Sequence, residues 1–169
     1  LEVKSDSINN AFSDYPFALN EITIQRKDTT SLLNISCQIN GNYLTNYWSD
    51  GLIISTPTGS TGYSLSNGGS IVSPESNVIL LNPIAPHNIN MRSLVIPDNS
   101  KISIDIEGDN DINLSVDSRM YSVNSSKQIK ILKADFTIGT IKFDNDNFYK
   151  RLREKLFWGQ DMRNKNINK

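Results

Sequence analysis

Residues 55–69, STPTGSTGYSLSNGG, combine small and hydroxyl-bearing side chains in a pattern that could bind a polar ligand. The stretch contains four glycines and seven Ser or Thr residues but no charged residue. A small-residue turn between a strand and a helix presents backbone N–H groups and hydroxyls to an anion or another polar ligand. The same composition is also typical of a tight structural turn, and the spacing alone leaves both interpretations open.

Two well-known loop chemistries do not fit this stretch. A P-loop would end in Gly-Lys-Ser/Thr, and that ending is missing. A nucleophile elbow, G-x-S-x-G, would need glycine at position 58, where the sequence has Thr58. The hydroxyls therefore predict ligand contacts or local turn bonds rather than a nucleophile or a phosphate-binding lysine site.

Other catalytic and metal-binding patterns are weak. His87 is the single histidine, and nothing in the sequence places Ser60 or Asp117 beside it to form a triad. No His, Cys or carboxylate cluster has metal-ligand spacing, so no metal site is predicted in this chain. Four alternating carboxylates could suggest calcium, but they lack the EF-hand loop pattern and favour an acidic strand end: Asp105, Glu107, Asp109 and Asp111.

The elements that must position these residues are mostly short strands. Alternating or short apolar runs, separated by turns about every ten residues, predict strands at 21–26, 32–39, 42–48, 51–56, 77–84, 101–107, 112–116, 128–132 and 136–143. In the last run the apolar phase shifts at Gly139, which predicts a bulge. The pattern is typical of a mainly β, layered, sandwich-like domain.

One hairpin is predicted in detail. Asn40-Gly41 favours a two-residue type I′ turn, because both central residues of that turn need positive φ. A regular two-residue register would pair Cys37 with Leu44 and Leu33 with Trp48 on one face.

Helices are expected in two places. A short helix can follow the 55–66 loop, and DNDNFYKRLREKLFWG, residues 144–159, predicts a C-terminal helix capped by Asp146 or Asn147 and followed by Gly159. We expect one domain over 1–169, with a flexible tail at 160–169.

Composition narrows the functional class. The net charge is −1, so neither nucleic acid nor an anionic membrane is an expected partner. No apolar run approaches the roughly 18 residues of a membrane helix, and the first residues lack the apolar core of a signal peptide. With Cys37 as the single cysteine, no internal disulfide can form, which suits a reducing, cytoplasmic location.

Four motifs together resemble the C-terminal domain of NAD kinases. They are ALNEI (18–22), DGLIISTPTGSTGYSLSNGG (50–69), PIAPHNINMRSLVIPD (83–98) and SVDSR (115–119). The resemblance covers the chain from about residue 20 to residue 158. The order and spacing of the four motifs make it specific. The resemblance implies a mainly β NAD-binding domain of an enzyme that uses ATP, with Mg²⁺, to phosphorylate the 2′-hydroxyl of the adenosine ribose of NAD.

The resemblance also implies a set of substrate-binding residues: Asn20, Glu21, Asp50, Thr58, Thr61, Gly62, Tyr63, Ser66, Ala85 and His87. An amide such as Asn20 can bond an adenine edge, and a carboxylate such as Glu21 can accept from ribose hydroxyls. Without the resemblance, Glu21 would be interpreted as an exposed residue at a strand start. Asp50 would contact the nicotinamide-side ribose, in a site shared between subunits of a homo-oligomer, either a dimer or a tetramer.

Two departures from the family pattern matter. Ser118 follows Asp117 where the family commonly has glycine, which puts that turn and its contacts in question. The family's Gly-Gly-Asp-Gly motif belongs to an N-terminal α/β domain, and here Gly68-Gly69 is followed by Ser70. The catalytic aspartate is therefore expected outside this chain, which would be the NAD-binding half of the kinase and inactive alone. A non-catalytic dinucleotide-binding or regulatory domain is the alternative, and a lipid-kinase relative is a more distant one.

Overall fold

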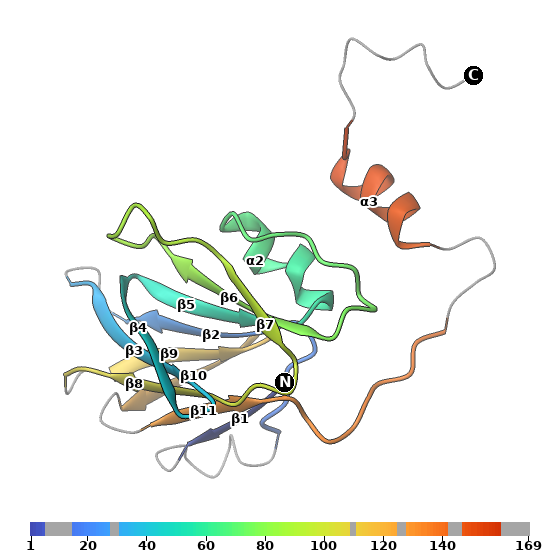
Figure 1. Cartoon of the computed structure of the whole chain (residues 1–169). Helices are drawn as coiled ribbons and strands as arrows, with labels where there is room; N and C mark the ends of the chain where they lie inside the picture. Colours follow the sequence, from blue (N-terminus) through green and yellow to red (C-terminus); the bar gives the residue numbers. More distant parts are fainter. Residues whose placement is uncertain (6–14, 28–30, 109–110, 125–127, 142–146, 160–169) are drawn as a thin grey trace, which may run out of the picture. The chain divides into compact units, whose positions relative to one another are not determined.

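The computed structural model describes residues 1–5, 15–27, 31–108, 111–124, 128–141 and 147–159. The chain divides into two compact units, Leu1–Asp135 and Phe136–Lys169. The first unit consists of two antiparallel sheets that face each other (Figure 1). This arrangement confirms the prediction of a mainly β, layered fold. The tail predicted at 160–169 lies outside the described residues.

Each sheet has a simple antiparallel order. The five-stranded sheet runs β1 (Glu2–Ser5), β11 (Ile129–Leu132), β8 (Ile102–Ile106), β3 (Leu33–Ile39) and β4 (Asn42–Ser49). The six-stranded sheet runs β10 (Arg119–Asn124), β9 (Asp111–Val116), β2 (Glu21–Arg26), β5 (Gly51–Ser55), β6 (Val78–Ile84) and β7 (Leu94–Pro97). Strands β1, β7 and β10 were not predicted from the sequence.

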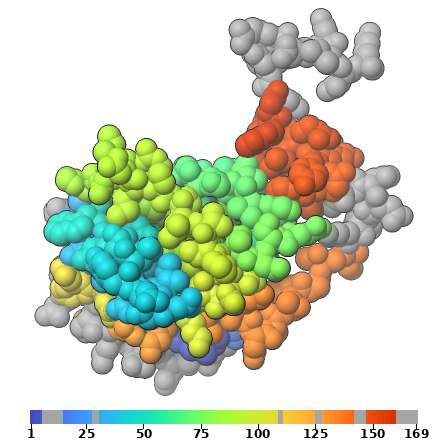
Figure 2. Space-filling view, in the orientation of Figure 1, coloured from blue at the N-terminus to red at the C-terminus, as the bar shows by residue number. Residues whose placement is uncertain are grey.

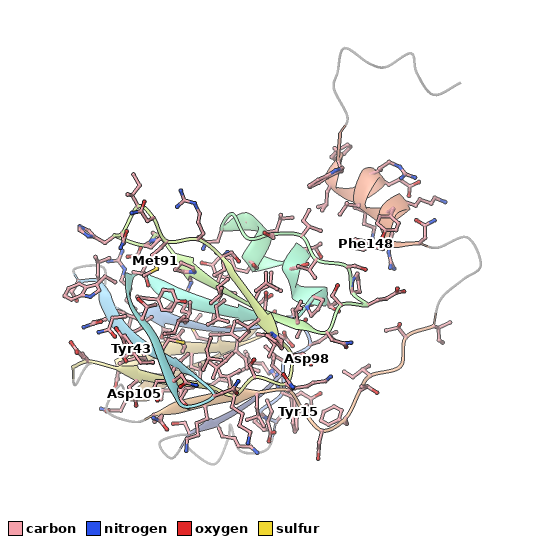
Figure 3. All side chains as sticks on the ribbon, in the orientation of Figure 1. Tyr15, Tyr43, Met91, Asp98, Asp105 and Phe148 are labelled. Carbon is pink, nitrogen blue, oxygen red and sulfur yellow. The ribbon has the colours of Figure 1, made fainter. Side chains whose placement is uncertain are left out.

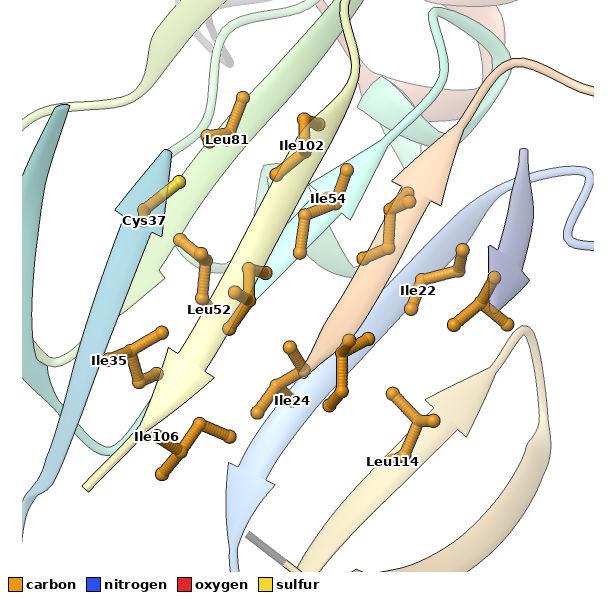
Figure 4. Close-up of a cluster of buried hydrophobic side chains, with 14 of the residues drawn as sticks. Ile22, Ile24, Ile35, Cys37, Leu52, Ile54, Leu81, Ile102, Ile106 and Leu114 are labelled. Carbon is orange, nitrogen blue, oxygen red and sulfur yellow. The ribbon is translucent and has the colours of Figure 1, made fainter. Parts of the chain in front are cut away.

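The core fills the space between the two sheets. Alternate residues of each strand point inward, so Ile22 and Ile24 of β2 meet Ile102 and Ile106 of β8 in one buried cluster (Figure 4). Side chains crowd this interlayer space throughout the unit (Figure 3). Cys37 is fully buried there, and burial raises the pKa of its thiol to about 12, so it is a packing residue rather than a reactive one.

Strand β5 is buried on both faces because a second layer covers its outer side. The 3₁₀ turn η1 (Thr58–Thr61) and the short helix α2 (Tyr63–Ser66) follow β5 directly and fold back over it (Figure 1). The predicted short helix is thus present, although it lies within residues 55–66 rather than after them. This covering explains why GLIIS is a continuous apolar run rather than an alternating one.

The β3–β4 hairpin has the predicted turn but not the predicted register. Asn40 and Gly41 have φ values of 52° and 78°, as a type I′ turn requires. A bulge then shifts the pairing, so that Cys37 lies opposite Thr45, and Leu33 opposite Ser49. The extra residue reverses the faces of β4: Tyr47 becomes buried, while Trp48 is 55% exposed.

The second unit contains α3 (Phe148–Leu156), whose first turn is capped by Asn147 accepting from the Lys150 N–H at 2.8 Å. The strand predicted at 136–143 is wrong for residues 136–141, and residues 142–143 lie outside the described residues. No described strand pairs with this segment, and Ile138 and Ile141 remain exposed, so their alternation lacks the hydrogen-bonding neighbour that a strand needs. No described helix is long and apolar enough to cross a membrane.

Candidate functional site

The hydroxyl-rich loop, residues 55–69, is hydrogen-bonded to the segment that precedes β2. The Thr56 N–H donates to the Asn20 carbonyl at 2.9 Å, and the Thr56 hydroxyl donates to the Leu19 carbonyl at 2.7 Å. The same hydroxyl oxygen accepts from the Gly59 N–H at 3.0 Å, which starts the turn that leads into η1. Two segments that are far apart in sequence are therefore held together by one main-chain bond and one side-chain bond from Thr56.

Gly59 allows this close approach. A Cβ at position 59 would lie 2.1 Å from the Asn20 carbonyl oxygen, far inside any real contact. The obstacle is backbone, which cannot rotate away. Glycine at this position is therefore required by contact and not by a special φ.

Glu21 lies under the loop with an unusual carboxyl environment. Its Oε2 is buried and has no hydrogen-bond partner among the described residues, and it lies 3.0 Å from where a Cβ on Gly62 would be. Burial raises the pKa of this carboxyl, the nearby charge of Asp117 raises it further, and a backbone bond from Tyr63 opposes both effects. An unpaired carboxylate oxygen beside a glycine is free to accept a hydrogen bond from a ligand.

Helix α2 brings the next predicted residues over the sheet. The Tyr63 hydroxyl accepts from Gln25 Nε2 at 2.8 Å, so the ring spans from α2 to β2. Asn82 Nδ2 donates to the Ser64 carbonyl at 3.0 Å and holds the helix on β6. Thr58, Thr61 and Ser66 belong to the same η1–α2 segment as Gly62 and Tyr63. Five of the predicted residues therefore come from one short segment that begins directly after β5.

The three remaining predicted residues form a second group near the start of β5. Asp50 pairs with Arg26 at 3.1 Å between Oδ2 and Nη2, and its N–H donates to the Ile84 carbonyl at 2.9 Å. The His87 N–H donates to the Trp48 carbonyl at 2.8 Å. Ala85 lies between these bonds with φ 43°, a left-handed conformation that is uncommon for alanine. Both Ala85 and His87 are exposed.

Strand β5 thus separates two groups of predicted residues. Asn20, Glu21 and the loop lie at its C-terminal end, and Asp50 lies immediately before its first residue. Five strand residues at about 3.3 Å each put roughly 16 Å between the ends. The Tyr63 ring reaches from the first group toward the second, because its hydrogen-bond partner Gln25 pairs with Gly51 at the start of β5. An elongated ligand with two polar ends matches this arrangement better than a compact one.

The described residues contain no group of three or more His, Cys, Asp or Glu side chains that could hold a metal ion. The acidic stretch considered for calcium instead makes separate contacts: Asp105 accepts from Gln128, and Asp111 pairs with Lys27. Asp109 lies outside the described residues.

Comparison with known proteins decides the family. The model of the ATP-NAD kinase C-terminal domain matches residues 19–143, which include every predicted site residue. The chain belongs to this family.

Curated members of the NAD kinase family resemble nearly the whole chain. An NAD kinase of Flavobacterium psychrophilum is 50% identical over 97% of this chain, and one of Flavobacterium johnsoniae is 48% identical over the same share. In each case the chain covers 56% of the relative, so it spans about half the length of the curated proteins that it matches.

Two solved structures of NAD kinase family proteins support the fold. Yeast NADH kinase, solved in complex with NADH, aligns with a TM-score of 0.75 and 32% identity over 85% of this chain and 45% of its own. An NAD kinase from Archaeoglobus fulgidus, solved in complex with ATP, aligns with a TM-score of 0.67 and 29% identity over 80% of this chain and 53% of its own.

Sequence reasoning missed several contacts that shape this NAD kinase domain. Gln25, Thr56 and Gly59 each hold a predicted residue or its loop in place. Gln25 lies in an alternating run, and Thr56 and Gly59 are small residues of the loop. Neither pattern indicates these contacts, because each contact is made with a distant segment. Asp117 lies in the SVDSR motif, but its bonds to the Asn20 segment had no signal in the spacing.

The replacement of glycine by Ser118 is accommodated. In the β9–β10 turn, Asp117 has φ 50°, whereas Ser118 is not among the residues with positive φ. The strained position is therefore filled by aspartate, which tolerates the left-handed region better than most residues. The turn itself therefore forms with serine at position 118, and its contacts with a ligand stay a prediction.

Proposed function

We propose that this chain is the NAD-binding part of an NAD kinase that transfers a phosphoryl group from ATP to the 2′-hydroxyl of the adenosine ribose of NAD. Family membership and the curated relatives named NAD kinase support the proposal. The two structural neighbours, solved with NADH and with ATP, fit the same substrates. The activity would belong to a protein of the relatives' full length.

The observation that carries this proposal is the carboxyl of Glu21. A buried carboxylate oxygen without a protein partner is costly unless a ligand supplies one. Ribose hydroxyls are suitable donors, and the amide of neighbouring Asn20 can bond an adenine edge. Both residues are held against the η1–α2 segment, whose Tyr63 ring would form a wall of the adenosine site and whose Thr58, Thr61, Gly62 and Ser66 would line it.

The second group would bind the nicotinamide end. Asp50 can accept from a ribose hydroxyl, while Ala85 and His87 would line the dinucleotide pocket. The separation along β5 suits a dinucleotide stretched between the two groups. In this scheme the chain orients the acceptor ribose, and phosphoryl transfer depends chiefly on such positioning and on charge stabilisation.

ATP and a divalent cation would be bound mainly by residues outside this chain. The sequence contains no Gly-Gly-Asp-Gly motif, and its described residues contain no carboxylate cluster that fits Mg²⁺. We therefore assign no metal ligand and no catalytic residue to the chain. It would act as the NAD-binding domain, working in the cytoplasm.

Self-association would complete the nicotinamide end. Tyr43 and Trp48 are 66% and 55% exposed on β4, the edge strand of its sheet, and Ile89 nearby is 83% exposed. The surface of β4 adjoins that of the residues around β7 on one face of the molecule (Figure 2). A self-complementary contact between two such faces would give a homo-oligomer, with the dimer as its simplest form and a tetramer built from dimers.

A non-catalytic dinucleotide-binding domain is the alternative function, because NAD binding alone needs no triphosphate-binding motif. NADP formation separates the two functions. A protein of the relatives' full length that forms NADP from NAD and ATP is a kinase, and one that binds NAD without forming NADP is a binding module.

A substitution at Glu21 tests the site itself. We expect Glu21→Gln to weaken NAD binding to this chain, measured by calorimetry or ligand-observed NMR. Glu154→Gln on the exposed face of α3 is the matched control and should bind as the wild type does. Equal affinities for Glu21→Gln and wild type would show that Glu21 makes no ribose contact.

A further inference from the structure

The turn between β9 and β10 makes an unusual number of bonds to the segment that carries Asn20 and Glu21. The carboxylate of Asp117 accepts from three successive backbone N–H groups. Oδ2 accepts from Leu19 at 2.9 Å, and Oδ1 accepts from Asn20 at 2.8 Å and from Glu21 at 3.2 Å. The Asp117 N–H donates in return to the Glu21 carbonyl at 2.9 Å.

The geometry of the turn is adapted to these bonds. Asp117 has φ 50°, which costs free energy for a residue with a side chain, and its carbonyl accepts from the Ser115 hydroxyl at 2.6 Å. Arg119, two residues further on, donates from Nη2 to the Phe17 carbonyl at 2.5 Å and stacks its guanidinium 4.5 Å from the centre of the Tyr15 ring. The turn therefore holds the chain on both sides of Ala18.

We propose that Asp117 is a positioning residue for the substrate-binding pair Asn20-Glu21: its carboxylate fixes the backbone of both residues. This inference rests on the proposed function for the identity of the ligand. A carboxylate that accepts charge-assisted bonds from three backbone N–H groups holds a short segment more tightly than neutral bonds would. Rigid support of this kind is what keeps binding side chains within a fraction of an ångström of their working positions.

The electrostatic part of the role follows from the same placement. Asp117 is the charged neighbour that raises the pKa of Glu21, after burial itself. The proton affinity of Glu21 is thus set in part by the residue that orients it. Loss of the charge at position 117 should lower the pH at which Glu21 titrates, whereas a purely mechanical role would leave that pH unchanged.

Two substitutions distinguish the effect of the Asp117 carboxylate from the effect of the left-handed turn. Asp117→Gly keeps the left-handed turn, because glycine adopts positive φ readily, but removes all three acceptor bonds. Asp117→Asn also tolerates this φ and can keep the bonds to Asn20 and Glu21, but it has no charge and turns an N–H₂ group toward the Leu19 N–H. Asp111→Asn, at the other end of β9 in an exposed pair with Lys27, is the matched control.

Three measurements on the chain test the proposal. In Asp117→Gly, amide exchange at Leu19 and Asn20 should be at least about tenfold faster, while that of Ile24 within β2 stays unchanged. The Glu21 carboxyl, followed by carbon-13 NMR, should titrate at lower pH in Asp117→Asn. NAD binding should weaken between about tenfold and a hundredfold in Asp117→Gly and less in Asp117→Asn.

The outcomes distinguish this inference from the proposed function. Unchanged exchange at Leu19 and Asn20, or an unchanged Glu21 titration, would overturn the positioning role whether or not NAD binds. Exchange and titration that change as expected, in a wild-type chain that binds no NAD, would support the positioning role and count against the proposed ligand. General destabilisation in Asp117→Gly that also accelerates exchange at Ile24 would overturn the local role, with Asp117→Asn as the check.

Discussion

The two ends of β5 are built in opposite ways. At the C-terminal end, Asn20 and Glu21 are fixed by bonds from the hydroxyl-rich loop on one side and from Asp117 on the other. At the N-terminal end, Asp50 makes one partly exposed ion pair, and Ala85 and His87 are exposed. The first end is assembled within the chain, whereas the second has open side chains that another surface could complete.

The two ends of β5 can therefore contribute differently to ligand specificity. A rigid, partly buried end can bind its part of the ligand without help from another surface, because its groups are organised before binding. An open end gains its contacts only when something else closes it. We therefore interpret the first end as the primary adenosine site and the second as a site completed by a neighbouring copy.

The largest expected effect is a loss of stability from a substitution at the C-terminal end of β5. Gly59→Ala would place a Cβ 2.1 Å from the Asn20 carbonyl oxygen, so the loop must move away from β2. We expect a loss of about 3 kcal/mol in the free energy of unfolding, measured by urea denaturation, together with loss of NAD binding. Gly139→Ala, where nothing lies within 4 Å, is the control. Wild-type stability in Gly59→Ala would mean that the loop does not approach Asn20 so closely.

The next effect concerns the ligand contact alone. Glu21→Gln removes a charged acceptor, and a hydrogen bond to a charged group contributes roughly 1.5–3 kcal/mol. In a protein of the relatives' full length, kcat/KM with NAD varied should fall accordingly, while kcat/KM with ATP varied should change far less. Equal losses for both substrates would point to a general distortion of the protein.

The pH dependence of binding follows from the same carboxyl. Burial and Asp117 raise the pKa of Glu21, so its charged form is lost as pH falls through that raised value. NAD affinity should therefore weaken on acidification through this range in the wild type and stay flat in Glu21→Gln. Calorimetric titrations at a series of pH values would show it. Parallel pH profiles for the two proteins would remove Glu21 from the explanation.

The stability of the protein should increase on acidification, whereas NAD affinity decreases. Because the folded state holds the Glu21 proton more tightly than the unfolded state does, stability falls as pH rises from the unfolded to the folded pKa and stays lower above it. Glu21→Gln should then unfold at a higher temperature than the wild type at neutral pH. This gain would disappear below the unfolded pKa, and thermal melts at the two pH values would detect it.

The smallest effect tests the open end. Asp50→Asn should reduce NAD affinity only under conditions in which the chain self-associates, since a shared site needs both copies. Light scattering over a concentration series gives the association, and calorimetry at two protein concentrations gives the affinity. A monomer persisting up to about 100 μM, which excludes association tighter than roughly −5.5 kcal/mol, would rule out the shared site in this chain.

The strands that alternate cleanly or run apolar were predictable from the sequence. EITIQR and KISIDIE predicted β2 and β8 because apolar residues alternate in each, and NG predicted the hairpin turn. The register of β4 was not predictable, since alternation does not reveal the bulge that leaves Leu44 unpaired and buries Tyr47 instead of Trp48. The 136–143 segment failed because alternation cannot reveal whether a partner strand exists.

For the candidate site, the sequence could predict the residues but not their arrangement in space. Its residues could be named from motifs, because Asn20-Glu21 and the hydroxyl-rich loop lie in contiguous stretches. Their mutual arrangement could not, because it rests on contacts between distant segments. Asp117 is about a hundred residues from Asn20 in sequence and 2.8 Å away in space between Oδ1 and N. No local pattern encodes such a contact.

We propose that this chain by itself contains an organised adenosine site centred on Glu21. Titrating the wild-type chain and Glu21→Gln with AMP and, separately, with nicotinamide mononucleotide tests it most directly. We expect AMP to bind to the wild type, Glu21→Gln to weaken this binding, and nicotinamide mononucleotide to bind more weakly than AMP. A folded chain that binds nicotinamide mononucleotide but not AMP, or that binds AMP equally well with glutamine at position 21, would contradict it.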